Sequence, residues 1–125
     1  MKILIDTNFI LTCIKQRLDF FSKANEIIDE GIEWLVPAGV IKELEMISKR
    51  KGEKIIDKES AAIALEMLRL IEPQKIELDS RNVDQGIVNY AVKNNIVVAT
   101  LDRGIKKKIN KKILTIKDIK SLEII

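Results

Sequence analysis

Two apolar segments of the sequence each end in an aspartate. Residues 1–6 read MKILID and residues 95–102 read NIVVATLD, so the two runs end at Asp6 and Asp102. Both runs are predicted to be buried strands of a parallel sheet. Ligands of open parallel sheets bind beyond the carboxyl ends of the strands. Asp6 and Asp102 are therefore predicted to be neighbours at one edge of the sheet.

Two further acids follow connections that can return to the same edge. Glu43 lies about one turn into the helix that follows VPAGVI, and Asp84 lies in the first turn of a helix that begins near Asn82. Four carboxylates gathered there would repel one another, and a divalent cation ordinarily relieves such repulsion. Because the site offers oxygen ligands only, the pattern favours Mg²⁺ or Mn²⁺ over Zn²⁺.

Each acid also has an ordinary structural interpretation. Asp84 can complement the dipole of its helix, and Glu43 can be an exposed helix residue paired with a neighbouring lysine. Asp102 can be a turn residue, and Asp6 can be the N-cap of the next helix. The metal-site hypothesis therefore depends on the four acids together.

The rest of the composition restricts the chemistry. The chain has 125 residues and no histidine, which excludes an imidazole base and a histidine-bound metal. Its five scattered glycines form neither a P-loop nor a dinucleotide-binding fingerprint. The single cysteine, Cys13, cannot form an intrachain disulfide and fits a reducing cytoplasm. Nothing resembles a signal peptide or a membrane span, so we expect a soluble, cytoplasmic protein without a membrane partner.

The elements that must position the acids alternate along the chain. Short apolar runs at 3–5, 32–37, 75–78 and 95–102 read as strands, and the segments between them have helical spacing. The later runs ILTI and LEII can complete a sheet edge. This alternation predicts one domain, residues 1–125, built as a three-layer α/β/α sandwich around a mainly parallel sheet.

The same spacing makes specific predictions for individual helices. Two helices are expected within residues 9–31, with Gly31 as their C-terminal stop. Phe20, Phe21 and Trp34 are expected in the core rather than on a base-stacking surface. The buried side of a helix at residues 57–73 is predicted to consist of Ile63, Leu65, Met67, Leu68 and Leu70.

Basic residues are concentrated in two segments, KRKGEK at 49–54 and RGIKKKINKK at 103–112, although the net charge is only +3. A run of charges is ordinarily a solvated surface. The second segment begins directly after Asp102, so its cations are expected beside the acids, where they can bind a nucleic-acid backbone without reading its bases. Lys111 and Lys112 are interpreted as surface lysines. The residues assigned to the nucleic-acid contact are Arg103, Lys106, Lys107 and Lys108.

Four segments, in order along the chain, resemble the PIN domain family: ILIDTNFIL, VPAGVIKELEMI, NVDQGIVNYA and IVVATLDRGIKKKI. The resemblance covers nearly the whole chain. It implies a metal-dependent ribonuclease with Mg²⁺ or Mn²⁺ as cofactor. The implied catalytic and metal-binding acids are Asp6, Glu43, Asp84 and Asp102, and the implied supporting residues, which would orient ligands or water, are Thr7, Asn8 and Thr100.

The resemblance also implies a mechanism. Asp6 would be the central ligand and Glu43 a ligand or water-orienting base, while the metal lowers the pKa of the attacking water. The products would carry a 3′-hydroxyl and a 5′-phosphate. Gln85 and Gly104 stand where relatives often have additional acids, so this acidic set is minimal and fits either one metal or two.

Within the family, the chain is similar to two kinds of small ribonuclease. The first is the archaeal PIN proteins related to the Fcf1-type rRNA-processing endonucleases, and we favour this kind. The second is the VapC-type toxins, which pair with an antitoxin. RNA, including rRNA, is the expected substrate. The sequence leaves the oligomeric state open, and a homodimer is one possibility because PIN relatives often dimerise. Two alternatives are a non-catalytic RNA-binding PIN module and a response-regulator receiver, which would need an adjacent acidic pair where Thr7 and Asn8 stand.

Overall fold

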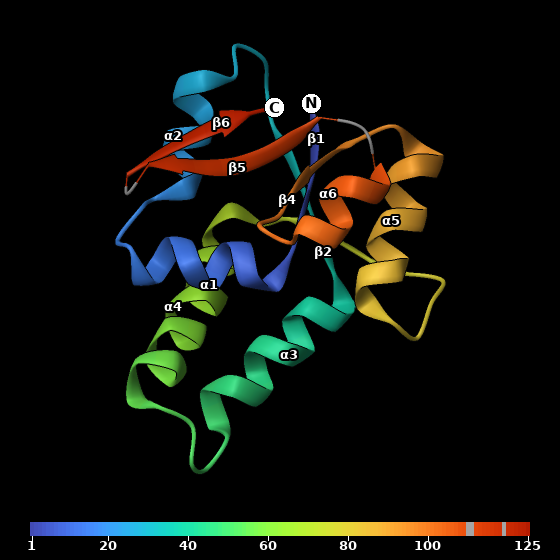
Figure 1. Ribbon diagram of the computed structural model, residues 1–125. Coiled ribbons are helices and arrows are strands. Elements are labelled where there is room, and N and C mark those ends of the chain that lie inside the picture. The colour runs from blue at the N-terminus through green and yellow to red at the C-terminus, as the bar shows by residue number, and fades with distance from the viewer. Residues whose placement is uncertain (110–111, 119) are drawn as a thin grey trace.

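The computed structural model describes residues 1–109, 112–118 and 120–125, which form six strands and six helices (Figure 1). The strands are β1 (Lys2–Ile5), β2 (Glu33–Pro37), β3 (Gln74–Ile76), β4 (Val97–Ala99), β5 (Ile113–Asp118) and β6 (Ser121–Ile124). The helices are α1 (Thr7–Lys15), α2 (Phe20–Ile27), α3 (Ala38–Lys49), α4 (Ile55–Ile71), α5 (Val83–Asn94) and α6 (Arg103–Ile109). None of these helices is long and apolar enough to cross a bilayer.

One six-stranded sheet runs through the molecule in the order β3-β2-β1-β4-β5-β6. Every neighbouring pair is parallel except β5 and β6, which form an antiparallel edge. Strand β1 lies between β2 and β4, and Ile5 stands opposite Ala99 in the register. The residues that follow these two, Asp6 and Thr100, therefore meet at the carboxyl edge of the sheet. The predicted α/β fold with a mainly parallel sheet is confirmed.

Alternate side chains of the central strands pack on opposite faces of the sheet. Ile3 and Ile5 belong to a core shared with helices α1 to α4, whereas Leu4 belongs to a second core shared with α5 and α6. Figure 1 shows α1, α2 and α4 on one side of the strands and α5 and α6 on the other. Strand β1 is apolar at each of these positions because both of its faces are covered.

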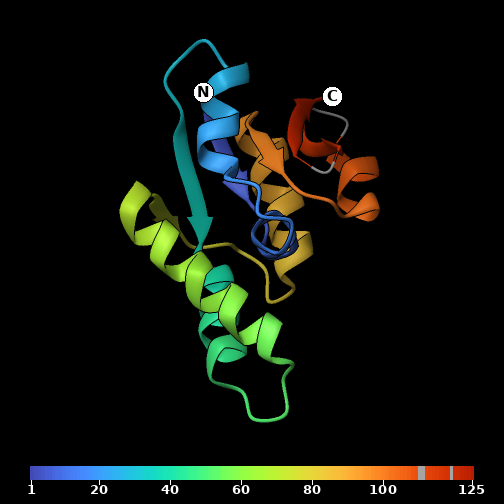
Figure 2. The ribbon, with the colours of Figure 1, turned by 90° about the vertical axis from the view of Figure 1, so that its left-hand side faces the viewer.

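A helical hairpin extends from the carboxyl edge of the sheet. Helix α3 begins directly after β2, and α4 returns against both α3 and α1. Figures 1 and 2 show the turned end of this hairpin projecting beyond the rest of the domain. The start of α3 therefore stands beside the edge at which β1 and β4 end.

The predicted helix stop at Gly31 was wrong. Helix α2 ends at Ile27, and Ile28 already has an extended backbone. The carbonyl oxygen of Gly31 instead accepts a hydrogen bond of 2.7 Å from the ammonium group of Met1. Gly31 thus belongs to the connection that leads the chain into β2, beside Met1, the residue that precedes β1.

The prediction for the buried side of α4 was right in part. Leu68 is buried, and Leu65 and Met67 are half-buried against the core, as predicted. Ile63 and Leu70 were also predicted to be buried but are 50% and 78% exposed, whereas Ala61 and Ala64 are buried. Small alanines allow the close approach of α4 to α1 and α3, so apolar spacing alone misjudged which face is covered.

The aromatic residues were predicted to lie in the core. Phe20 and Trp34 are buried in edge-to-face contact at 5.4 Å, and Phe21 packs against the same core.

Gly86 allows α5 to pack closely against the segment that follows β3. A Cβ atom built at Gly86 would lie 2.9 Å from Cβ of Leu78. We expect Gly86→Ala to destabilise the domain by about 1–2 kcal/mol, because the methyl group must displace Leu78. Chemical denaturation measures this change. The matched control is Gly39→Ala in α3, where the nearest atom is 3.4 Å away; equal stability of the two variants would contradict the prediction.

Candidate active site

Asp6 lies at the carboxyl end of β1 and immediately before α1. Its backbone N–H donates to the carbonyl oxygen of Ala99 in β4 at 3.0 Å, and its side chain is only 5% exposed. Asp6 occupies the N-cap position of α1, but its side chain makes no cap hydrogen bond. Its Oδ2 accepts a hydrogen bond from Thr100 Oγ1 at 2.9 Å instead. Capping of α1 therefore does not explain a buried carboxylate at this position.

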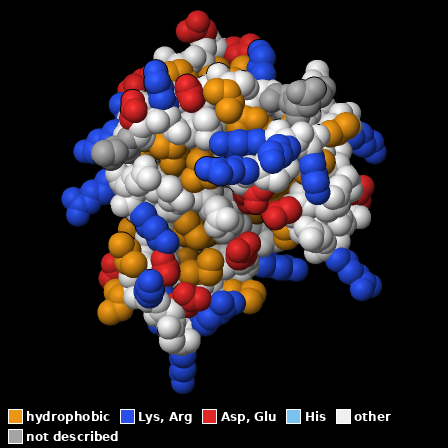
Figure 3. Space-filling view, in the orientation of Figure 1, with side chains coloured by type: hydrophobic (Ala, Val, Ile, Leu, Met, Phe, Trp, Pro, Cys, Tyr) orange, Lys and Arg blue, Asp and Glu red, His pale blue; other side chains and the backbone are white. Residues whose placement is uncertain are grey.

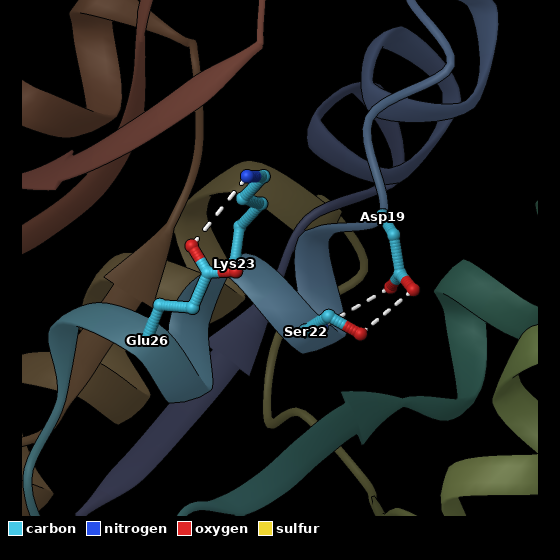
Figure 4. Close-up of polar contacts among 4 residues, drawn as sticks. All are labelled: Asp19, Ser22, Lys23 and Glu26. Atoms are coloured by element: carbon cyan, nitrogen blue, oxygen red, sulfur yellow. Dashed lines mark hydrogen bonds and ion pairs between the residues drawn. The ribbon is translucent and has the colours of Figure 1, made fainter.

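Asp19 shows what a capping aspartate does in the same chain (Figure 4). It occupies the N-cap of α2, where Oδ1 accepts from the N–H of Ser22 at 3.1 Å and Oδ2 accepts from the Ser22 hydroxyl at 2.8 Å. Lys23 and Glu26 pair nearby on the same helix. Asp19 is exposed and its oxygens bond locally, whereas Asp6 is buried and bonds to a residue 94 positions away.

Thr100 connects Asp6 with Asp102. Its hydroxyl donates to Asp6 and accepts a hydrogen bond of 3.1 Å from the N–H of Asp102, and the residue is fully buried. Asp102 Oδ1 accepts from the N–H of Ile105 at 2.9 Å, which caps the start of α6. The turn interpretation of Asp102 is thus correct for one oxygen. Within the described residues, no hydrogen bond engages its Oδ2.

The carboxyl group of Asp6 is electrostatically unusual. Its pKa is raised above the ordinary value, chiefly because burial disfavours the charged form. The hydrogen bond from Thr100 opposes this effect, while the negative charges of Asp84 and Asp102 raise the pKa further. Two further acids therefore act on Asp6, and a cation near them would relieve the repulsion.

Glu43 reaches the same region from α3. Its Oε2 accepts a hydrogen bond of 3.1 Å from the hydroxyl of Thr7, which is buried in the first turn of α1. Glu43 itself is exposed, as is Asn8 beside Thr7. No ion pair joins Glu43 to a lysine within the described residues, so the pairing with a neighbouring lysine is not present.

Asp84 lies exposed in the first turn of α5, as predicted. Asn82 is the N-cap of this helix, since its Oδ1 accepts from the N–H of Gln85 at 3.0 Å. A cavity of about 90 Å³ separates α5 from α6, and its lining includes Asp84, Asp102, Gly104 and Lys108. Asp84 therefore borders this cavity, and its position in the first turn also fits the ordinary interpretation that it complements the dipole of α5.

The basic segment after Asp102 forms helix α6, which the sequence reading did not predict. Ile105 and Ile109 anchor the helix in the core. Lys106 is half-buried and donates to Thr115 Oγ1 of β5 at 3.2 Å. Figure 3 shows acidic side chains at the centre of one face, with basic side chains directly above them.

The remaining predicted cations of this segment differ in position. Arg103, Lys107 and Lys108 are exposed on α6. Lys112 lies at the opposite edge of the sheet, beside Met1 and Ile96, so it is a surface lysine away from the acids. Lys111 lies outside the described residues.

An ion at this edge would have few direct protein ligands. Within residues 1–109, 112–118 and 120–125, no three acidic, histidine or cysteine side chains are grouped to bind one ion. Mg²⁺ commonly takes one or two carboxylates and retains several waters. Cys13 is no alternative ligand, because burial raises the pKa of its thiol to about 12. The available donor set is therefore carboxylate oxygens with hydroxyl support.

The sequence profile of the PIN-like domain family matches residues 3–120. The chain belongs to this family. It is 28% identical over 109 residues to ribonuclease VapC4 of Methanocaldococcus jannaschii, an alignment that covers 86% of this chain and 82% of that protein. The predicted resemblance to PIN domains is thus confirmed.

Solved structures share the PIN-like fold. The structure of the PIN domain endonuclease Utp24 aligns with a TM-score of 0.79 at 23% identity, covering 98% of this chain and 90% of that one. VapBC2 from Rickettsia felis, bound to a DNA fragment from its promoter, aligns with a TM-score of 0.62 at 18% identity, covering 92% and 98%. At these identities the likeness concerns the fold.

In this PIN-like domain the predicted acids come from four elements, and their catalytic roles remain predictions. Asp6, Asp84 and Asp102 interact electrostatically, and Glu43 is connected to them through Thr7. The sequence reading placed Thr7 near ligands or water, but it did not indicate a bond to Glu43, because the two residues are 36 positions apart.

Proposed function

We propose that this PIN-like domain is a metal-dependent endoribonuclease. The observation that carries the proposal is Asp6, a buried carboxylate at the end of the central strand that caps no helix and interacts with Asp84 and Asp102. Burying such a group is unfavourable unless a positive charge compensates it. The names of two similar proteins, ribonuclease VapC4 and the endonuclease Utp24, support the same class of reaction.

Each residue has a defined part in this proposal. Asp6 and Asp102 hold the cation, and Thr100 connects the carboxylate of Asp6 with the backbone N–H of Asp102. Asp84 contributes from α5, directly or through water, and Glu43 orients the attacking water. A bound Mg²⁺ or Mn²⁺ would lower the pKa of water and neutralise charge on the phosphate.

The test is cleavage of an end-labelled structured RNA in Mn²⁺ or Mg²⁺. We expect internal cuts that leave a 3′-hydroxyl and a 5′-phosphate. Asp19→Asn is the matched control, because Asp19 is also an N-cap aspartate but its side chain is exposed. Cutting by Asp6→Asn at the wild-type rate would refute the proposed site, and RNA binding without cutting by the wild type would favour a non-catalytic module.

Two cellular roles fit an endoribonuclease of this kind. We propose RNA processing, including that of rRNA, as the first role. The relationship to VapC4 supports a second, a toxin that pairs with an antitoxin. Induced expression in growing cells separates them: growth arrest that depends on Asp6 indicates a toxin, whereas accumulation of uncut precursor RNA after gene deletion indicates processing.

A homodimer remains the proposed assembly. Several large apolar side chains are exposed on α4, namely Ile55, Ile56, Ile63 and Leu70. Light scattering after size-exclusion chromatography measures the mass in solution. A dimer that is lost in Ile63→Ser supports this assembly, and a monomeric wild type excludes it under the conditions used.

Among the cations of α6, Lys108 is expected to contribute most to RNA binding. It borders the cavity that also contacts Asp84 and Asp102, whereas Lys106 is engaged by Thr115. We expect Lys108→Ala to raise KM about three- to tenfold and to reduce the salt dependence of RNA affinity by roughly one phosphate contact, with kcat nearly unchanged. Fluorescence anisotropy at several salt concentrations measures this.

Lys93→Ala is the control for Lys108→Ala. Lys93 is an exposed lysine in the last turn of α5, at the opposite end of that helix from Asp84. We expect its removal to leave the KM and the salt dependence unchanged. Equal effects of the two substitutions would mean that the charge of the whole surface, rather than Lys108, determines RNA affinity.

A further inference from the structure

Glu43 is an exposed side chain that accepts one described hydrogen bond. It is the sixth residue of α3, on the hairpin that projects from the sheet edge. Among the described residues, its hydrogen-bonding partner is the Thr7 hydroxyl at 3.1 Å. A glutamate has several rotatable bonds, and holding it in one conformation carries an entropy cost that some contact must offset. The position of the Glu43 carboxylate therefore depends on Thr7.

Thr7 is well suited to hold that carboxylate. It is the first residue of α1 and is only 3% exposed, so its side chain is fixed by the surrounding core. As a β-branched residue it has few side-chain conformations.

Thr7 is also fixed in position relative to the second carboxylate. It directly follows Asp6 in the chain, and the Asp6 carboxylate accepts a hydrogen bond of 2.9 Å from the Thr100 hydroxyl. The Thr7 hydroxyl therefore places the exposed acid of α3 at a defined position relative to the buried acid that follows β1.

We propose that Thr7 is a positioning residue, which sets the Glu43 carboxylate at a fixed place relative to Asp6 and so couples the projecting α3–α4 hairpin to the sheet edge. This inference rests on the proposed ribonuclease function, in which Glu43 orients the attacking water. Thr7 does not itself touch the reacting atoms.

A double-mutant cycle with Thr7→Val and Glu43→Ala tests the coupling. Thr7→Val keeps the shape of the side chain and removes the donor, so kcat is expected to fall about tenfold with KM unchanged. In the Glu43→Ala background the same substitution is expected to have no further effect. Thr7→Ser restores the hydroxyl and should retain most of the activity. Thr12→Val, elsewhere on α1, controls for the substitution itself.

Two outcomes overturn the inference. One is an equal loss from Thr7→Val in the wild-type and Glu43→Ala backgrounds, because Thr7 would then act independently of Glu43. The other is a Thr7→Ser variant as defective as Thr7→Val. If Thr7→Val fails to fold, as judged by circular dichroism, Thr7→Ala replaces it in the same cycle.

A second measurement does not require activity. The ¹³C resonance of the Glu43 carboxyl group is expected to shift in Thr7→Val, but not in Thr7→Ser or Thr12→Val. If the wild type does not cleave RNA and this shift is present, the ribonuclease proposal fails but the positioning of Glu43 by Thr7 stands. If the Glu43 resonance is the same in wild type and Thr7→Val, the positioning of Glu43 by Thr7 is refuted whether or not RNA is cleaved.

Discussion

Asp6→Asn is expected to abolish RNA cleavage and to make the metal-free domain more stable. Cleavage should fall by about 10³-fold or more, because losing the central carboxylate removes roughly 4 kcal/mol of transition-state stabilisation by the cation. Asparagine keeps an oxygen that can accept the hydrogen bond from Thr100. The substitution therefore removes the charge without removing the contact.

The gain in stability follows from the direction of the Asp6 pKa shift. Burial, with Asp84 and Asp102, raises the pKa of this carboxyl in the folded protein. The folded state then binds more protons than the unfolded state between the ordinary aspartate pKa and the raised one, so the free energy of unfolding falls as pH rises through that window. Asp6→Asn removes this loss, so its melting temperature should exceed that of the wild type at neutral pH.

Thermal unfolding in EDTA between pH 4 and pH 8 measures the effect. The difference between wild type and Asp6→Asn should be smallest at the acidic end and largest at neutral pH. Asp19→Asn should change neither the melting temperature nor the cleavage rate appreciably, because asparagine is as good an N-cap as aspartate. A less stable Asp6→Asn variant would mean that the buried charge is compensated within the protein.

Removal of divalent cations is expected to stop cleavage, and Mn²⁺ or Mg²⁺ is expected to restore it. The same cation should stabilise the folded domain, because it relieves the repulsion among Asp6, Asp84 and Asp102. At a free Mn²⁺ concentration about 100 times the Kd, the added stability is about 2.7 kcal/mol. Differential scanning calorimetry with and without EDTA measures it.

Asp6→Asn distinguishes cation binding at this site from cation binding elsewhere on the protein. The variant should lose the Mn²⁺-induced rise in melting temperature, whereas Asp19→Asn should keep it. Cleavage that persists in EDTA, or an equal rise in all three proteins, would exclude a functional metal at this edge. Because the melting temperature is measured as well as cleavage, the experiment tests metal binding even if the protein does not cut the chosen RNA.

Much of the architecture could be read from local patterns. The run KILI is apolar at consecutive positions, which requires a strand covered on both faces, and β1 has that surrounding. An acid that directly follows such a strand must lie at its carboxyl end, because the chain is continuous. For the same reason the sequence assigns Asp6 to the carboxyl edge of a parallel sheet. Asp102 lies three residues beyond the end of β4 and is connected to this edge through Thr100.

Contacts between distant segments could not be read in this way. Periodicity selected Ile63 and Leu70 for the buried side of α4, but the approach of α1 and α3 covers the face that carries Ala61 and Ala64. The spacing of apolar residues shows where hydrophobic residues recur along a helix. It does not show which side of the helix the neighbouring helices cover. The basic segment that begins at Arg103 was interpreted only as a run of charges. It forms helix α6, and its buried residues Ile105 and Ile109 anchor this helix in the core.

The sequence by itself determined the fold class, the family resemblance and the candidate acids, because each depends on residue types at fixed short spacings. Only the tertiary structure decided which oxygens are engaged. Thr100 meets Asp6 because Ile5 and Ala99 are in register, and Thr7 meets Glu43 because α3 starts beside α1. Hydrogen bonds require atoms within about 3 Å, and that proximity arises from strand register and helix packing across the whole chain.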